Sequence, residues 1–569
     1  MSKYPDINNK DFGKKITKTF NEYKIPSSIK TFDQICYPKK YKLQLPQKFV
    51  SNFINPKTKY NGLLIYHQIG AGKTCAALKI AENFKGKRKI IICTPASLIN
   101  NMYKELMTQC VDDEYISKKE QTELTQLNPT SKKYLDIITK AEKKINKFYK
   151  IYSYNKFVNL VDSKKLYLNN SILIIDEVQN IVSNTGSFYK TYLKIINKTK
   201  DIKVVLLSGT PIFDKPNEIA LTLNLLKLPK ALPVRKKFND TFIKITNCKK
   251  EGDDDCIYKI KNANLFKNFI KGHVSFYRGA PPIAFPKKKF NLVYCKMSDY
   301  QYKSYLTVAE DEGFRTGQIL DLPNSFFIGS RIISNIAFPK KKINEEGFND
   351  FKGKYLKMSN LKEYSIKFYT IVKHIKKSDG LVFVYSNFKS YGGIMSLSRI
   401  LDANGFKSYK DHGIGNNRYA IWSGSEPLHV KNNIRNIFNH KNNKNGSKIK
   451  IILGTPSIKE GVTLLRIKDV HIIEPYWNYS LLEQVIGRAV RYCSHKDMPI
   501  SKRKVNIYLY ISVYKNDKYL IDQYILDLAD KKKNIIEQFN ILLKEAAVDC
   551  KLNYNGNVYS KKEEYKCLN

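Results

Sequence analysis

The sequence predicts an α/β protein with two doubly wound parallel-sheet lobes and a mostly helical segment between them. Short apolar runs recur along the chain and end in glycine, hydroxyl or carboxylate residues, which is typical of buried parallel strands. A glycine-bearing loop with a lysine follows one such run, and a pair of carboxylates follows another about a hundred residues later. That spacing suits a doubly wound sheet in which both features lie at the carboxyl ends of strands.

The first element is the apolar run Leu63–Tyr66, which predicts a buried strand. Gly70 and Gly72 follow it, and small residues let backbone N–H groups approach phosphate oxygens. The helix expected from about Thr74 directs the positive end of its dipole to the same place. Lys73 is expected to hold the β- and γ-phosphates, and Thr74 to bind Mg²⁺. The predicted nucleotide-binding residues of this loop are His67, Gln68, Ile69, Gly70, Ala71, Gly72, Lys73 and Thr74.

The second half of the predicted site is a carboxylate pair at the end of the run Ile172–Asp176. It is needed because His67 stands where the G-x-x-x-x-G-K-T pattern has its first glycine, so the loop alone leaves a chance match open. Asp176 is expected to hold Mg²⁺ through water, and Glu177 to polarise the attacking water as general base. The alternative, two solvated acids at a strand end, loses weight because of the spacing from the loop.

A third strand is predicted for Ile202–Pro211, and its end carries Ser208 and Thr210. Hydroxyl groups at this edge of the sheet could couple the phosphate site to a neighbouring lobe. A plain turn at Gly-Thr-Pro explains the same residues equally well, so both interpretations stay open at this point.

A helix is predicted at "QVIGRAVR", where Val485, Ile486, Ala489 and Val490 can pack against a sheet. Three polar residues at i, i+4 and i+7 then share another face of that helix. Arginine donates from a planar fork that matches phosphate oxygens, and it can stabilise charge on a transferring phosphoryl group. The three residues are Gln484, Arg488 and Arg491. If one lobe holds the phosphates and the other supplies arginine, hydrolysis requires the lobes to close.

The net charge of +48 points to a polyanionic partner such as nucleic acid. Only 12 of the 99 basic residues are arginine, so an AT-rich genome would also produce this excess of lysine. The chain shows no apolar run long enough to span a membrane and no signal peptide at its start. Ten scattered cysteines without a Cys-x-x-Cys pair then predict reduced thiols and a cytoplasmic, non-secreted protein.

The motifs, taken in order, resemble those of superfamily 2 helicases and translocases. They are "HQIGAGKT", "TPASLINN", "DEVQ", "SGTP", "KEGVTL" and "QVIGRAVR". The stretch "PYWNYSLLEQVIGRAVRYCSH" is similar to the last motif of viral nucleoside triphosphatase I and of the early transcription factor small subunit. The resemblance covers about residues 40 to 510 and implies two RecA-like lobes with ATP between them.

The resemblance also implies roles for individual residues. Gln47 would read the adenine edge, while Gln484, Arg488 and Arg491 would reach the nucleotide from the second lobe. Gln179 stands where most of that viral group has histidine, at a position that links the carboxylate loop to the other lobe. Glutamine can still form hydrogen bonds there, but it cannot titrate. The expected lobe-coupling residues are Gln179, Ser208 and Thr210, and the expected catalytic residues are Lys73, Glu177, Arg488 and Arg491.

Both lobes are expected to bind the nucleic-acid backbone through strand ends that carry hydroxyl groups. The candidates are Thr94, Ser97, Ser386 and Thr455. Contacts of this kind read phosphates and not bases, so little sequence preference is expected. A plain strand-to-loop junction explains each of them equally well when it is taken singly.

The predicted organisation has five parts. They are an N-terminal extension (1–40), a first RecA-like lobe (41–230), a mostly helical linker or insertion (231–357), a second RecA-like lobe (358–515) and a C-terminal extension (516–569). A Lys- and Glu-rich helical insertion is expected within the first lobe at 112–148, and the last dozen residues are expected to form a mobile terminus.

The leading hypothesis is an ATP-hydrolysing, DNA-dependent translocase that serves viral-type transcription, with ATP and Mg²⁺ as cofactors. Its partners would be nucleic acid, with DNA favoured and RNA left open, and a viral-type RNA polymerase or transcription factor subunit. It would act in the host cytoplasm, and presence in the virion is left open. The alternatives are a strand-separating RNA or DNA helicase of the same fold and a non-catalytic basic scaffold of a transcription complex.

Overall fold

The computed structural model describes residues 4–28, 30–68, 70–128, 131–182, 186–246, 256–312, 327–459, 462–515 and 520–568. The chain divides into two compact units. Unit 1 comprises Met1–Thr246, Tyr258–Pro281 and Asn534–Asn569, and unit 2 comprises Asn247–Ile257 and Pro282–Lys533. Each unit is built on its own parallel sheet, as the sequence predicts.

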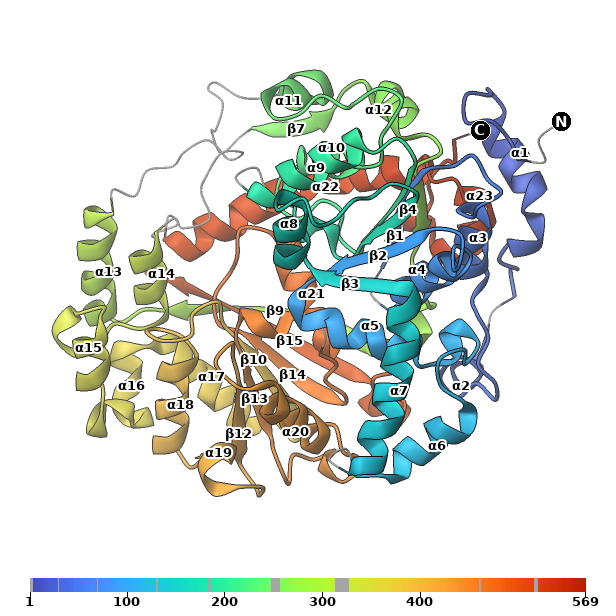
Figure 1. The fold of residues 1–569 in the computed structure, drawn as a ribbon. Coiled ribbons are helices and arrows are strands. Elements are labelled where there is room, and N and C mark those ends of the chain that lie inside the picture. Colours follow the sequence, from blue (N-terminus) through green and yellow to red (C-terminus); the bar gives the residue numbers. More distant parts are fainter. Residues whose placement is uncertain are drawn as a thin grey trace. The chain divides into compact units, whose positions relative to one another are not determined.

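The sheet of unit 1 has the strand order β3-β2-β4-β5-β1-β8, and all neighbouring strands run parallel (Figure 1). Its strands are β1 (Gly62–His67), β2 (Lys89–Thr94), β3 (Tyr149–Ser153), β4 (Ser171–Ile175), β5 (Ile202–Ser208) and β8 (Val274–Tyr277). The short strands β6 (Ile243–Thr246) and β7 (Ile257–Ile260) pair with each other. Because β1, β2, β4 and β5 are neighbours or near neighbours, the loops at their carboxyl ends gather at one edge of the sheet.

Both faces of this sheet are covered by helices. Strands β1, β4 and β5 are buried along their whole length and are mostly apolar, which is why they appear in the sequence as hydrophobic runs. On one face, Leu63 and Ile65 share a core with Phe49 of α3 and Leu78 of α4. On the other face lie α8 and α9 (Figure 1), whose Phe157 and Tyr192 rings stack with centroids 4.5 Å apart.

The helices of unit 1 are numbered in chain order. They are α1 (Phe12–Thr19), α2 (Phe32–Cys36), α3 (Leu45–Phe53), α4 (Lys73–Glu82), α5 (Ile99–Leu106), α6 (Lys118–Gln126), α7 (Lys132–Phe148), α8 (Tyr154–Asp162), α9 (Ser187–Lys198), α10 (Glu218–Asn224), α11 (Lys236–Phe242), α12 (Ala263–Ile270) and α23 (Cys550–Asn557). The long helix α22 (Ile521–Glu545) begins in unit 2 and ends in unit 1.

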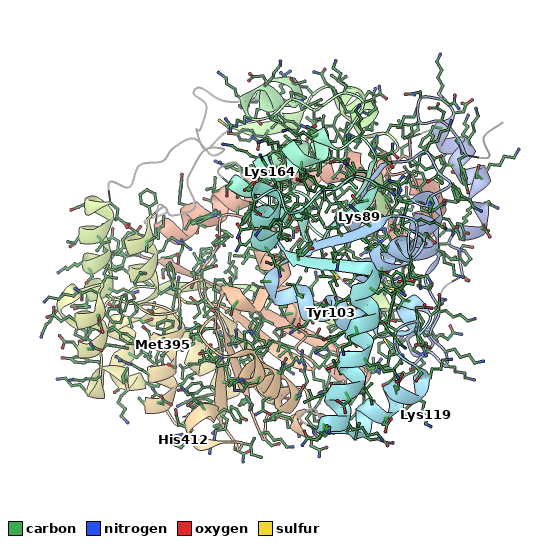
Figure 2. All side chains as sticks on the ribbon, in the orientation of Figure 1. Lys89, Tyr103, Lys119, Lys164, Met395 and His412 are labelled. Carbon is green, nitrogen blue, oxygen red and sulfur yellow. A yellow bond between two sulfur atoms is a disulfide. The ribbon has the colours of Figure 1, made fainter. Side chains whose placement is uncertain are left out.

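The helical insertion predicted at 112–148 is confirmed as α6 and α7. Ser117 caps α6 in a capping box with Glu120, so the start of this helix is encoded locally. The Tyr103 hydroxyl of α5 donates to Asn146 Oδ1 of α7 at 2.7 Å and ties the insertion to the core. Figure 2 labels Tyr103 and, on α6, Lys119. The insertion is thus a helix pair with a net positive charge, and Ile145 of α7 also packs it into the core of unit 1.

The sheet of unit 2 has the order β11-β12-β13-β10-β14-β15-β9, again with parallel neighbours. Its strands are β9 (Lys287–Lys296), β10 (Leu381–Tyr385), β11 (Lys407–Ser408), β12 (Arg418–Trp422), β13 (Ile451–Gly454), β14 (Ile467–Ile472) and β15 (Lys504–Val513). Its helices before α22 are α13 (Asp299–Asp311), α14 (Ile328–Asn335), α15 (Glu345–Asp350), α16 (Met358–Tyr364), α17 (Ile366–Lys377), α18 (Ile394–Ala403), α19 (Tyr409–His412), α20 (Leu428–Phe438) and α21 (Tyr479–Ala489).

The central strand β10 shows how this sheet is packed. Leu381, Phe383 and Tyr385 point to a core shared with α20 and α21, while Val382 and Val384 point to a core shared with α17 and α18. This alternation follows from the two-residue period of a strand. Helices therefore cover both faces of the second sheet as well.

The prediction of a separate helical linker at 231–357 is wrong. This stretch does contain helices, but β8 pairs with β1 at the edge of the first sheet, and β9 pairs with β15 at the edge of the second. The division between the units falls at Pro281 and not at residue 230. The prediction failed because both edge strands are short or rich in lysine, and a composition of this kind does not reveal pairing with distant strands.

The C-terminal residues are also an integral part of a sheet lobe. Among the described residues, α23 packs against β8, and Arg278 forms an ion pair with Glu563 at 2.7 Å. The expectation of a mobile terminus is therefore wrong for the stretch up to Leu568. None of the helices that the structure describes is both long enough and apolar enough to cross a bilayer.

The cysteines correct another expectation. Cys75 of α4 is joined to Cys110, and Cys550 of α23 is joined to Cys567, each pair by a disulfide. Cys93 and Cys295 are free and buried. The sequence predicts only reduced thiols because pairing depends on which cysteines the fold brings together, and sequence spacing does not report this.

Candidate nucleotide-binding and hydrolysis site

The glycine-bearing loop lies between β1 and α4, as predicted. Gly70 and Gly72 both have positive φ values, 85° and 73°. Gly72 directly precedes α4 and has a left-handed conformation, and a Cβ atom there would lie only 2.4 Å from Nε2 of Gln47. The loop therefore needs glycine for its conformation and for its close approach to Gln47. Ile69, one of the predicted nucleotide contacts, lies outside the described residues.

Gln47 is placed against this loop by α3. Its side chain is buried, its Nε2 donates to the Gly72 carbonyl at 3.1 Å, and its Oε1 accepts from the Gln44 N–H at 2.8 Å. A glutamine amide has two donor hydrogens and two acceptor lone pairs, so each end keeps one further hydrogen-bonding position. The predicted role of Gln47 at the adenine edge is compatible with this geometry and stays a prediction.

The carboxylate pair follows β4 directly. Asp176 is only 4% exposed, and its two oxygens accept from the Thr94 hydroxyl at 3.3 Å and from the Glu177 N–H at 3.0 Å. Glu177 takes a left-handed conformation with φ 48°. The Tyr154 hydroxyl of α8 donates to the Asp176 carbonyl and, at 3.1 Å, to the Glu177 carbonyl. Tyr154 was not among the predicted site residues, because no sequence spacing relates it to the carboxylate loop.

Two charged side chains, Glu177 and Lys73, act on the buried carboxylate of Asp176 in opposite directions. Burial raises the pKa of Asp176 to about 7, the negative charge of Glu177 adds to this rise, and the positive charge of Lys73 opposes it. Lys73 therefore acts on the carboxylate loop although the two are about a hundred residues apart. A buried carboxylate of this kind fits a hard cation such as Mg²⁺, which prefers oxygen ligands. Thr74, the other predicted Mg²⁺ ligand, is partly exposed at the first turn of α4.

The three predicted lobe-coupling residues form one hydrogen-bonded chain. Gln179 Nε2 donates to Glu177 Oε2 at 2.6 Å, and Gln179 Oε1 accepts from the Ser208 hydroxyl at 2.7 Å. Ser208 Oγ in turn accepts from the Thr210 N–H at 3.0 Å. This chain joins the ends of β4 and β5 and fixes both ends of the glutamine amide. The end of β5 is thus connected to the carboxylate loop within unit 1, and the coupling of these residues to the other lobe stays a prediction.

The predicted contacts with a nucleic-acid backbone need correction. Ser97 is exposed, whereas Thr94, Ser386 and Thr455 are no more than 4% exposed. The Thr94 hydroxyl is used by Asp176, and the Ser386 hydroxyl contacts both oxygens of Glu474 at 3.0 and 3.1 Å. These three hydroxyls are buried and are bonded to partners within the protein, so in this structure they do not face outward, whereas the role of Ser97 stays a prediction. Sequence reasoning sees a hydroxyl at a strand end but not the partner that covers it.

The two predicted catalytic arginines of unit 2 donate to the same backbone carbonyl. Arg488 Nη1 and Arg491 Nη1 donate to the Val462 carbonyl at 3.2 and 3.0 Å. Arg488 Nε also donates to the Gln484 carbonyl at 3.2 Å. Helix α21 ends at Ala489, so the prediction that all three polar residues share a helical face is wrong for Arg491. The two guanidinium groups nevertheless come together, because the chain after the helix turns back toward Val462.

The apolar side of α21 agrees with its predicted packing. Val485 and Ala489 are fully buried in the core of unit 2, and Ile486 and Val490 pack against that core. Asn478 caps the helix by accepting from the Leu481 N–H at 2.9 Å. The helix is therefore held firmly against the second sheet.

Comparison with known proteins matches both halves of the chain. Residues 45–348 match the profile of the SNF2-related domain, and residues 366–493 match that of the helicase conserved C-terminal domain. The chain is 48% identical over 570 residues to a candidate ATP-dependent RNA helicase of Acanthamoeba polyphaga mimivirus, covering 99% of both chains. A second candidate ATP-dependent RNA helicase of that virus is 27% identical, over 97% of this chain and 79% of that protein. The termination factor NPH-I homolog of African swine fever virus is 24% identical, over 86% and 76%.

Proposed function

The chain belongs to the SNF2-related helicases of superfamily 2, and from that premise we propose that this ATP-hydrolysing enzyme translocates on duplex DNA during transcription of the viral type. The membership covers both sheet lobes. ATP use and nucleic-acid binding come with the family. The preference for DNA, the role in transcription and the partnership with a viral-type RNA polymerase or transcription factor are parts of the proposal, as is action in the host cytoplasm or the virion.

One observation carries the proposed chemistry, namely the gathering of phosphate-binding and carboxylate residues at the carboxyl edge of the first sheet. Lys73 follows β1, and Asp176 and Glu177 follow β4, which lies beside β5 in the same sheet. The field of Lys73 at Asp176 supports a shared site. A triphosphate lying along the first turn of α4 would meet both groups.

Each residue has a distinct role in the proposal. Lys73 binds the β- and γ-phosphates, and Glu177 orients and deprotonates the attacking water. Mg²⁺, held by Thr74 and Asp176, would neutralise phosphate charge when bound. Gln179 holds one oxygen of Glu177 and so fixes the direction of its other lone pairs. Gln484, Arg488 and Arg491 of unit 2 act on the same nucleotide, with arginine stabilising the charge on the transferring phosphoryl group.

The nucleic-acid part of the proposal rests on charge and on relatives. A net charge of +48 favours binding to a phosphate backbone. Similarity to a termination factor homolog supports a role in transcription. RNA unwinding is the second candidate function, and the more similar mimivirus relative, described as a candidate RNA helicase, favours it.

The test measures ATP hydrolysis with single-stranded DNA, duplex DNA and RNA at one fixed salt concentration, because affinity for nucleic acid depends steeply on salt. Duplex DNA should stimulate most. Glu177→Gln should abolish hydrolysis while ATP binding persists, and Lys73→Ala should abolish binding. A displacement assay on duplexes with a single-stranded overhang separates the two candidates. ATP-driven separation of RNA strands, with no stimulation by duplex DNA, would replace the proposal by the second candidate.

A further inference from the structure

A buried hydrogen-bond chain connects the C-terminal segment with the start of the phosphate-binding loop. His67, the last residue of β1, places Nε2 at 2.9 Å from the Ser275 hydroxyl of β8. Ser275 donates to Asp549 Oδ2 at 2.6 Å. All three side chains are fully buried. Residues more than 480 positions apart in the sequence therefore lie in one chain of contacts.

Asp549 reaches this place because α23 closes the open edge of the first sheet. Strand β8 is the edge strand, so the backbone of Phe276 has no further strand beside it. Asp549 Oδ1 accepts from the Phe276 N–H at 3.0 Å, and Asn553 and Asn557 donate to the Phe276 carbonyl at 3.1 and 3.3 Å. Asp549 directly precedes α23, and Asn553 and Asn557 follow it at spacings of four residues, so the three side chains lie on one side. They replace the hydrogen bonds of a missing strand.

The end of β8 also contacts the loop itself. The Gln68 N–H donates to the Tyr277 carbonyl at 3.0 Å. Gly279 has φ 99°, and a Cβ there would lie 3.2 Å from Cβ of Ala71. Because β8 and the residues after it contact Gln68 and Ala71, the placement of β8 by α23 also affects the phosphate-binding loop.

The donor and the acceptor of each hydrogen bond in this chain can be assigned. Asp549 Oδ2 accepts from Asn553 Nδ2 at 2.8 Å as well as from Ser275, so an ionised Asp549 can only accept. Ser275 has one hydroxyl hydrogen and gives it to Asp549. Its oxygen must then accept from His67, which places the imidazole hydrogen on Nε2. Nδ1 of His67 carries the lone pair and is buried without a hydrogen-bond partner.

Protonation of this imidazole is opposed by its surroundings. Burial lowers the pKa of His67 to about 3, and the positive charge of Lys73 adds to the effect. The surroundings therefore keep the His67 ring neutral and in one tautomer beside Lys73. The glycine that usually stands at this position offers no side chain to anchor.

We propose that Asp549 and Ser275 are positioning residues of the ATP site, which hold His67 as the neutral Nε2–H tautomer and thereby fix the start of the phosphate-binding loop. The inference rests on that loop being the ATP site. It makes the last 36 residues of the chain, Asn534–Asn569, a working part of the ATPase lobe. A comparable arrangement, in which a buried aspartate sets a histidine tautomer, is known to matter greatly for catalysis in serine proteases.

The test is Asp549→Asn in the full-length protein. The new amide donates where the carboxylate accepted, so the hydrogen direction reverses and His67 should change to the Nδ1–H tautomer. Nitrogen-15 NMR of the imidazole groups at about pH 8.5 reports this directly, with His67→Gln identifying the signal. That pH is chosen because burial raises the pKa of Asp549 to about 7, so the carboxylate is ionised. The KM for ATP should rise about tenfold.

Asn557→Ala is the matched control, because it loosens the same edge of β8 without touching the three-residue chain. It should leave the His67 signal unchanged and raise the KM for ATP much less than Asp549→Asn does. If Asp549→Asn does not fold, Ser275→Ala cuts the chain at its middle and should also raise KM. An Nδ1–H signal in the wild type, or an equal rise in KM for Asn557→Ala, overturns the inference. Lys73→Ala separates the two proposals, because retained ATP binding in that variant refutes the site itself while the tautomer can still be read.

Discussion

Removing the hydroxyl of Ser208 should slow ATP hydrolysis without weakening ATP binding. This serine ends β5, is fully buried, and donates to Gln179 Oε1 at 2.7 Å while accepting from the Thr210 N–H at 3.0 Å. Ser208→Ala deletes one oxygen atom and removes the hydrogen bonds that this oxygen makes with Gln179 and Thr210, which are both partly exposed. Gln179 then keeps only its contact with Glu177, at 2.6 Å.

The magnitude follows from the net contribution of a hydrogen bond to a partly exposed group, which is about 0.5–1.5 kcal/mol. If Gln179 no longer holds Glu177 in the orientation that activates water, this cost appears in the transition state. A loss of this size lowers kcat about 2- to 12-fold, since 1.4 kcal/mol corresponds to about tenfold. The KM for ATP should change less than about twofold, because the substitution leaves the loop around Lys73 untouched.

The assay is steady-state ATP hydrolysis at saturating nucleic acid. Ser208→Thr keeps the hydroxyl and should retain most of the activity. Ser171→Ala is the matched control, because Ser171 is equally buried and donates to the Leu168 carbonyl at the opposite end of the sheet. It should cost stability with no change in kcat. A Ser208→Ala enzyme with the wild-type kcat, or an equal fall in Ser171→Ala, refutes the reasoning.

Three further predictions concern the loop and the stability of each unit. Gly72→Ala should weaken ATP binding about tenfold or more in a filter or calorimetric assay, because φ 73° is strained for alanine and its Cβ atom would displace the Gln47 amide, 2.4 Å away; unchanged affinity contradicts this. Lys367→Ala should lower the free energy of unfolding of unit 2 by about 3–5 kcal/mol, because it removes the ion-pair partner, 2.5 Å away, of the buried carboxylate of Asp522. Thermal unfolding measures it, and the double variant with Asp522→Leu should recover most of the loss. Reducing the Cys75–Cys110 bond, or Cys110→Ser, should destabilise unit 1 by about 2–4 kcal/mol in urea; an equal urea midpoint with and without reductant argues against it.

The sequence by itself determined the elements that depend on local pattern. Apolar runs such as Ile172–Ile175 are buried on both faces of a parallel sheet, so their periodicity and their polar ends identify strands and the edge where the site lies. The loop around Lys73 and the carboxylates Asp176 and Glu177 could be predicted because their chemistry requires fixed residue types at short spacings. The apolar face of α21 followed from helical periodicity in the same way.

Only the tertiary structure decided which distant residues meet. Tyr154 at the carboxylate loop, Thr94 turned to Asp176, and Asp549 linked to His67 are contacts between elements whose order in the sheet no local pattern encodes. The edge strand β8 was missed for the same reason, since a four-residue strand is recognised only by the neighbour with which it pairs. Hydrogen bonds and disulfides depend on distances in space, and these distances are set by the packing of whole sheets and helices. Sequence spacing records the order of residues along the chain, so it can name the chemical groups of a site but not their partners.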